Sequence, residues 1–178
     1  RKIAVKTLNA KYNDFKAQLD PRRSENGSGV SYLWEFENIP QVIPEPNMPA
    51  AVEINPGFIV SSFSDWQGIY AWWWALASDK IKADAAISAE VKLLTVRARS
   101  DAQKAAAIHN FCAQKIRYVA VEYGDAGYEP HQAADIYKNK YGDCKDQAIL
   151  LVTMLRQAGL KSWPVLIGTR DHYNLDPA

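Results

Sequence analysis

The sequence has few of the residues that build metal centres and disulfide frameworks. Its 178 residues include only two cysteines and three histidines, and their spacing matches neither a zinc site nor a CxxC redox pair. Two thiols are also too few for a disulfide framework, although Cys112 and Cys144 could form a single bridge. We therefore expect no metal site and no cofactor.

Long apolar runs and an excess of charge of one sign are also absent. No run approaches the ~20 apolar residues that span a bilayer, so we expect no membrane span. The net charge of +1 gives no indication of a nucleic-acid partner. With 48% hydrophobic and 23% charged residues, the composition is that of a soluble globular protein. No signal peptide is visible, but the chain starts at Arg1, as a mature or trimmed product would.

The first ~65 residues have the pattern of β-structure. In "VSYLWEFENI" the aromatic residues Tyr32, Trp34 and Phe36 recur at every second position, which predicts a strand. The preceding "RRSENGSG" predicts a turn, and "AVEINPGFIVSSF" predicts two short strands around its Pro-Gly pair. The proline-rich "IPQVIPEPNMP" is expected to be an extended crossover, because each proline removes a backbone donor.

From residue 64 the apolar period changes from two to about 3.6 residues. "SDWQ" (64–67) and "SDAQ" (100–103) both fit the capping box, and each opens an amphipathic helix. Two more helices are expected over residues 83–95 and 133–138, with a short strand in "IRYVAVEYG" between them. Cys112 shares an apolar helical stripe with Ile108 and Ile116, which predicts a core residue.

Three consecutive tryptophans, Trp72, Trp73 and Trp74, cover about 200° of a helix surface at ~100° per residue. One packed face cannot hide all three. We favour an arrangement in which they fill the junction between the β part and the helical part. A patch that binds a sugar or an aromatic ligand is the alternative.

The stretch "YGDCKDQAILLVTMLRQAG" predicts a helix that begins at Cys144. Asp143 is a strong N-cap residue, and Asp146 places a second carboxylate in the first turn. Gly159 is a natural left-handed terminator. The apolar residues recur at helical spacing: Ala148, Leu151, Val152 and Leu155.

The first position of a helix favours an anion, because unpaired N–H groups and the helix dipole point toward it. A thiol in such a place can have its pKa lowered from ~8.5 to ~3.5–7.5, which makes it a nucleophile. Lys145 adds positive charge, whereas Asp143 and Asp146 oppose the effect unless capping uses their charges. The local sequence leaves two interpretations of Cys144 open: an activated nucleophile, or a small buried residue that closes the helix end.

The region "YVAVEYGDAGYEPHQAADIYKNKYGDCKDQAILLVTMLRQAGLKSWPVLIGT" resembles the transglutaminase-like superfamily of papain-like cysteine enzymes. The "YGDCKD" context with "GYxPH" upstream is similar to a bacterial branch. There a β-sandwich domain of unassigned function commonly precedes the core, and "SYLWEFENIP", "EPNMP" and "SSFSDWQ" resemble its end. The resemblance implies an α+β fold. Residues 1–65 would be the C-terminal part of the β-sandwich domain, and residues 66–178 a papain-like core that lacks its last strands.

The resemblance also implies a catalytic triad. Cys144 matches the nucleophile, which forms a thioester with the acyl group. A histidine and then an aspartate, on successive strands after the nucleophile helix, serve as base and orienting acid. We expect both beyond Ala178, with His172 a weaker candidate for the base, so that the fragment alone is not expected to turn over.

Eight further residues are expected to support Cys144 or line its pocket. His131 matches a recurring superfamily position other than the base, and His109 is expected to be a surface or core residue of its helix. The supporting set is Tyr123, Tyr128, His131, Tyr141, Gly142, Asp143, Lys145 and Asp146.

By the same resemblance, the substrate is a peptide or protein with an amide or glutamine-type carbonyl. Water as acceptor gives a peptidase or amidase, and an amine gives a crosslinker or acyltransferase; we favour peptide or amide cleavage. The alternative is a non-catalytic binding or scaffold module in which Cys144 is a relic, because fold alone does not decide function. The resemblance suggests an extracytoplasmic location, periplasmic or exported, and the oligomeric state stays open.

Overall fold

The computed structural model describes residues 4–8, 11–12, 15–16, 21–27, 29–35, 37–38, 41–43, 45–49, 57–63, 65–120 and 122–167. The chain divides into two compact units, residues 1–66 with 166–178, and residues 67–165. Among the described residues, strands are the regular structure of the first unit and helices dominate the second, so the predicted α+β class is confirmed.

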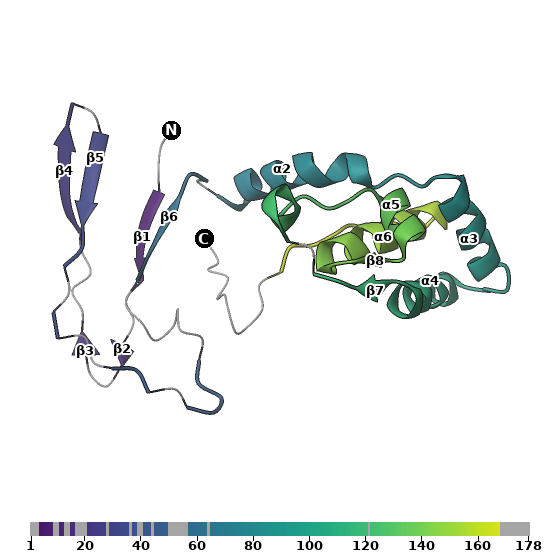
Figure 1. Ribbon diagram of the computed structural model, residues 1–178, viewed down its shortest axis with the longest axis horizontal. Coiled ribbons are helices and arrows are strands. Elements are labelled where there is room, and N and C mark those ends of the chain that lie inside the picture. The colour runs from purple at the N-terminus through teal and green to yellow at the C-terminus, as the bar shows by residue number, and fades with distance from the viewer. Residues whose placement is uncertain are drawn as a thin grey trace. The chain divides into compact units, whose positions relative to one another are not determined.

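In its described residues, the first unit contains three antiparallel strand pairs (Figure 1). β1 (Ala4–Leu8) pairs with β6 (Gly57–Ser61), with Ala4 opposite Ser61 and Leu8 opposite Gly57. The other pairs are β2 (Lys11–Tyr12) with β3 (Phe15–Lys16), and β4 (Arg22–Asn26) with β5 (Gly29–Leu33).

The strand pair β4–β5 corrects one prediction. The segment Arg22–Asn26, expected to lie in a turn, is a strand that is exposed along its whole length. Because neither face is buried, no apolar alternation marks it in the sequence. The rings of Tyr32 and Trp34 stack with centroids 5.9 Å apart, as expected for residues on one face of a strand. Phe36 and the first of the two strands predicted around Pro56 lie outside the described residues.

The proline-rich segment contains no helix or strand in its described ranges, 41–43 and 45–49. The Met48 N–H donates to the Glu45 carbonyl at 3.2 Å, and Asn47 has a φ of 61°. The segment therefore includes a tight turn, which was not part of the predicted extended crossover.

The second unit is built from α2 (Trp66–Ala77), α3 (Ala85–Thr95), α4 (Asp101–Lys115), α5 (Ala133–Asn139) and α6 (Cys144–Gln157). The 3₁₀ turns η1 (Ser78–Lys80) and η2 (Gly124–Gly127) connect them, and β7 (Arg117–Tyr118) pairs in parallel with β8 (Tyr141–Gly142). Among the described residues, none of the helices has the length and apolar character needed to cross a membrane.

Side-chain caps explain where two of these helices begin. Asp84 accepts the Ile87 N–H at 2.7 Å, so α3 begins two residues later than the predicted range. Ser100 accepts the Gln103 N–H at 3.2 Å, which confirms the predicted start of α4. The Gln103 side-chain oxygen accepts the backbone N–H of Arg99 rather than that of Ser100.

Helix α6 lies at the centre of the second unit, with α3, α4 and α5 packed around it (Figure 1). Ile149, Leu150 and Met154 are fully buried, and each buried aliphatic side chain contributes about 1.5–3 kcal/mol. Cys112 on α4 is buried as predicted, with its Sγ 3.9 Å from the Met154 Sδ. This burial raises the pKa of the Cys112 thiol to about 11.

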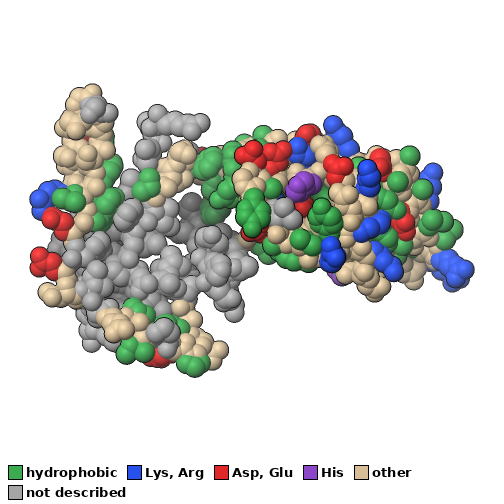
Figure 2. Space-filling model, in the orientation of Figure 1, with side chains coloured by type: hydrophobic (Ala, Val, Ile, Leu, Met, Phe, Trp, Pro, Cys, Tyr) green, Lys and Arg blue, Asp and Glu red, His purple; other side chains and the backbone are tan. Residues whose placement is uncertain are grey.

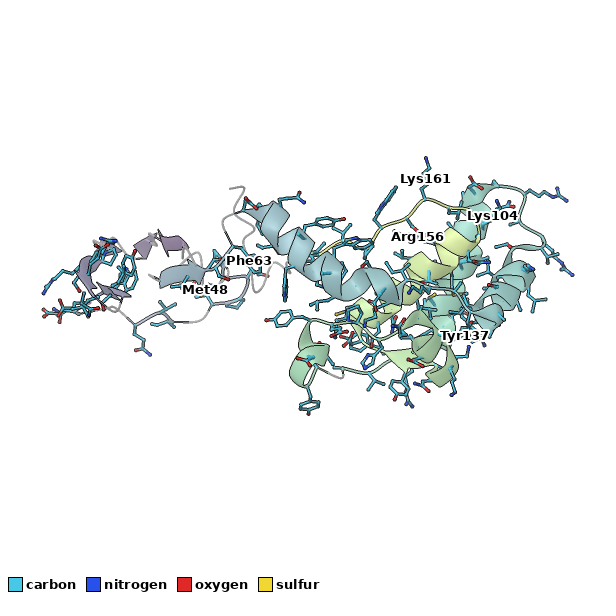
Figure 3. All side chains as sticks on the ribbon, turned by 90° about the horizontal axis from the view of Figure 1, so that it is seen from above. Met48, Phe63, Lys104, Tyr137, Arg156 and Lys161 are labelled. Atoms are coloured by element: carbon cyan, nitrogen blue, oxygen red, sulfur yellow. The ribbon has the colours of Figure 1, made fainter. Side chains whose placement is uncertain are left out.

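The chain turns sharply after the C-terminal end of α6. Gly159 has a φ of 83°, the left-handed conformation predicted for the terminator. The Arg156 guanidinium donates two hydrogen bonds to the Ser162 carbonyl, at 2.8 and 2.9 Å. Figure 3 shows Arg156 beside the segment that carries Lys161. The chain that follows is thus held against α6, which fixes the helix at both ends.

The tryptophan run packs within the helical unit. Trp73 is buried and its Nε1 donates to the Tyr128 carbonyl at 3.3 Å. The Trp72 ring meets the edge of the Tyr128 ring, with centroids 5.4 Å apart, and Trp74 stacks on Tyr70 at 6.1 Å. Two tryptophans therefore hold the loop of Tyr128 on α2. Their predicted place at a junction with the β part stays a prediction.

Candidate active site

The candidate site forms where α6 begins. Cys144 is the first residue of α6 and is exposed. Asp143 is the N-cap and is fully buried; its Oδ1 accepts the N–H groups of Lys145 and Asp146, each at 3.2 Å. In return, Asp146 Oδ2 accepts the Asp143 N–H at 3.3 Å. Both halves of a capping box are present, so the predicted helix start is confirmed.

The two carboxylates beside Cys144 have partners. Lys145 Nζ forms an ion pair with Asp143 Oδ2, and the Lys145 side chain is itself mostly buried. Asp146 is engaged by the cap and by His131. Capping and ion pairing therefore offset most of the negative charge of these carboxylates. An anion at Cys144 is favoured under that condition.

Gly142 makes room for this arrangement. A Cβ at Gly142 would lie 2.6 Å from the Asp146 Cβ and 3.0 Å from its Oδ2. Any larger residue would push Asp146 away from the cap. The Gly142 carbonyl accepts the Val119 N–H at 3.0 Å, which attaches the cap to β7.

Strand β7 brings Tyr118 beside the cysteine. The parallel register places Tyr118 opposite Gly142, two residues before Cys144, and the Tyr118 phenol interacts electrostatically with the Cys144 side chain. The electrostatic effect of Cys144 is the largest influence that raises the pKa of Tyr118, followed by desolvation. The hydroxyl therefore keeps its proton and can donate it in a hydrogen bond at the sulfur.

His131 contacts the cap from the other side. Its Nδ1 lies 3.1 Å from Asp146 Oδ2 and 3.2 Å from Oδ1, and its backbone N–H donates to Oδ1 at 2.8 Å. The imidazole is 48% exposed, whereas Asp146 is 2% exposed. A cavity of about 80 Å³ lies beside this pair, and its lining includes Tyr141 and Asp135.

The predicted site residues thus fall into two groups. His131, Gly142, Asp143, Lys145 and Asp146 gather at the start of α6, and Tyr141 lines the adjoining cavity. Tyr128 packs on Trp72 instead, and Tyr123 is largely exposed at the cap of η2.

Two predicted histidines lie elsewhere. His109 is exposed on α4, and His172 lies outside the described residues. Tyr118 was not among the residues predicted for the site, although a strand was predicted there. Only the parallel pairing of β7 with β8 identifies that residue. Both cysteines are free thiols. In the part of the chain that the structure describes, no three His, Cys, Asp or Glu side chains are grouped to hold a metal ion.

A family model for the transglutaminase-like superfamily matches residues 88–174, a range that contains α4, α5, α6 and the cap of Cys144. Residues 88–174 thus match the core of that superfamily. The resemblance found in the sequence is thereby confirmed, and the capped helix of Cys144 lies inside this core.

One solved structure is similar to most of the chain. It is the crystal structure of a "putative protease" from Parabacteroides distasonis ATCC 8503, with a TM-score of 0.71 and 17% sequence identity. The match covers 89% of this chain and 30% of that chain, so the present chain spans about a third of the neighbour's length. At this identity the likeness is one of fold, a papain-like α+β core. A comparison with curated proteins gave no match.

Proposed function

We propose that the transglutaminase-like core is a cysteine-dependent acyl-transfer enzyme in which Cys144 is the nucleophile. One observation carries the proposal: an exposed thiol at the first position of a helix whose capping box is complete. Helix N-termini favour thiolates, and the thiolate is the nucleophilic form of cysteine. Asp143 and Asp146 are buried and paired, whereas Cys144 at the start of the same helix is exposed.

The chemistry follows from what surrounds the sulfur. Cys144 Sγ attacks the carbonyl carbon, a C–S bond forms, and the carbonyl oxygen becomes an oxyanion. Asp143 already accepts the N–H groups of Lys145 and Asp146. We therefore assign oxyanion stabilisation to the Cys144 N–H and the Tyr118 hydroxyl. When the leaving group departs with a proton, the acyl group remains on Cys144 as a thioester.

The remaining parts of the triad belong to the same proposal. A histidine beyond Ala178 takes the thiol proton and returns it to the leaving amine, and an aspartate orients the histidine ring. We further propose that residues 1–65 are the end of a β-sandwich domain that precedes the core. This chain spans 30% of the similar solved protein. That difference in length supports a search for the histidine, the aspartate and the rest of the β-sandwich domain in a longer parent protein.

Peptide or amide cleavage, with water as the acyl acceptor, is the reaction that we propose. The name of the solved neighbour, which refers to a protease, supports this choice over crosslinking. Acidic and basic side chains are interspersed on the face of the helical unit drawn in Figure 2. Such a surface is compatible with peptides of either charge.

The test uses the parent protein and its Cys144→Ala variant with an unfolded protein substrate. We expect the wild-type protein to cleave the substrate and an acid quench to trap an acyl group on the peptide that contains Cys144. Cys144→Ala should lower cleavage by at least about 10³-fold, a loss typical of nucleophile removal. Cys112→Ala is the control, and it should retain cleavage. A folded parent protein that neither cleaves nor becomes acylated would support the non-catalytic module instead.

A further inference from the structure

The imidazole of His131 is attached to the carboxylate that closes the cap in front of Cys144. Asp146 Oδ2 lies 3.1 Å from His131 Nδ1 and accepts the Asp143 N–H, while Oδ1 accepts the backbone N–H of His131. Because Asp146 is buried, its charge interacts with neighbouring charges more strongly than it would in water. A change of charge on His131 is therefore transmitted to the start of α6.

We propose that His131 is a positioning residue that sets the charge at the start of α6, so that the reactivity of the Cys144 thiol follows the protonation of His131. This inference rests on the proposed role of Cys144 as nucleophile, and it concerns the regulation of that site. An ionised carboxylate only accepts hydrogen bonds, so His131 Nδ1 carries a hydrogen and Nε2 is the nitrogen that takes up the second proton.

Charged and titratable groups face His131 from several neighbouring elements. Lys80 is paired with Glu129 at 2.7 Å, and Lys145 is paired with Asp143, so Asp146 is the carboxylate in direct contact with the ring. The whole set comprises Lys80 on η1, Asp125 on η2, Glu129 after it, Asp135 on α5, Tyr141 on β8, and Asp143 and Asp146 at α6.

The sign of the effect follows from these contacts. Protonated His131 offsets the negative charge of Asp146, which favours a thiolate at Cys144. Neutral His131 leaves that charge in place and disfavours the thiolate. The gain in Cys144 reactivity is thus present at low pH and is lost as the pH rises through the range in which histidine releases its proton, about pH 5 to 8.

The test compares alkylation of Cys144 by iodoacetamide in the wild-type chain, His131→Gln and His109→Gln between about pH 5 and 9. Glutamine keeps an amide donor for Asp146 but takes up no proton. His109→Gln is the matched control, because it removes an exposed histidine from α4. Peptide mass spectrometry follows both cysteines, and buried Cys112 reports whether each protein is folded.

We expect Cys144 of the wild type to react about two- to fivefold faster than Cys144 of His131→Gln below pH 6. The ratio of the wild-type rate to the His131→Gln rate should approach one above about pH 8. The rate of His109→Gln should match that of the wild type at every pH. A ratio that is constant with pH, or equal to one everywhere, would overturn the role of His131. A Cys144 that reacts no faster than an unfolded thiol at any pH would overturn the proposed function instead.

A reciprocal measurement avoids any variant that fails to fold. The His131 ring is titrated by NMR in the wild-type chain before and after Cys144 is alkylated. Linkage requires that removal of the thiolate weakens proton binding by His131, so its titration midpoint should move to lower pH. If Cys144 reacts but the titration midpoint of His131 does not move, the two groups are not coupled and the proposal is wrong.

Discussion

Tyr118 lies opposite Gly142, two residues before Cys144, and interacts electrostatically with the Cys144 side chain, although η2 and α5 separate the two residues along the chain. The two-residue parallel pairing of β7 with β8 brings them together. Two side chains from other segments therefore meet the start of α6: His131 contacts Asp146, and Tyr118 interacts with Cys144. Each can be tested separately from the fold.

Tyr118→Phe removes the hydroxyl and keeps the ring. We expect alkylation of Cys144 at neutral pH to slow by about three- to tenfold, because the variant loses a polar hydroxyl that can donate a hydrogen bond to an anionic sulfur. Stability should change by less than about 0.5 kcal/mol, since Tyr118 is exposed. Tyr123→Phe, at a position that is 85% exposed, is the control. Equal alkylation rates in the two variants would remove Tyr118 from the site.

Gly142→Ala tests the space in front of the cap. The new Cβ would meet the Asp146 Cβ at 2.6 Å, so we expect a loss of about 1–3 kcal/mol in the free energy of unfolding. Gly127→Ala is the matched control, because its nearest neighbour would lie at 3.9 Å. Urea unfolding measures both. Should Gly142→Ala be as stable as Gly127→Ala, the close approach of Asp146 is wrong.

Asp143→Ala removes the N-cap and leaves the mostly buried Lys145 without its ion-pair partner. We expect a loss of about 2–3 kcal/mol in stability, the combined effect of a lost cap and an unpaired cation. Asp143→Asn keeps a cap acceptor and should lose less. Thermal unfolding at neutral pH ranks the two. The reverse order would mean that the charge of Asp143, rather than its cap, stabilises the helix start.

The sequence predicted the start of α6 because every residue that decides it is local. Gly142, Asp143 and Asp146 are within five positions, and their side chains cap the helix that follows them. The strand β4 was missed because it is polar and exposed on both faces. The contacts of His131 and Tyr118 depend on where loops return in the folded chain, which no spacing in the sequence encodes.

Cys112 predicts a pH dependence of stability. Burial raises the pKa of its thiol to about 11, from 9.0 in an unfolded chain. The unfolded state therefore releases this proton first, and stability that is complete below pH 9 is lost as the pH rises toward 11. The loss should reach about 2–3 kcal/mol, at 1.36 kcal/mol per pH unit.

Urea unfolding from pH 8 to 11 checks this dependence. Cys112→Ala should be less stable at pH 8, because it leaves a small cavity in the core, but its stability should fall less over the same range. Parallel pH curves for the two proteins would contradict the account of the buried thiol.

The most direct test of the central claim is the rate at which iodoacetamide alkylates Cys144 at about pH 6.5, in the native chain and in urea. If the capped helix start and Tyr118 stabilise a thiolate, native Cys144 reacts at least about tenfold faster than unfolded Cys144, while native Cys112 stays unlabelled. A native rate equal to or below the unfolded rate, with Cys112 still protected, would show that a well-folded helix start does not activate this thiol.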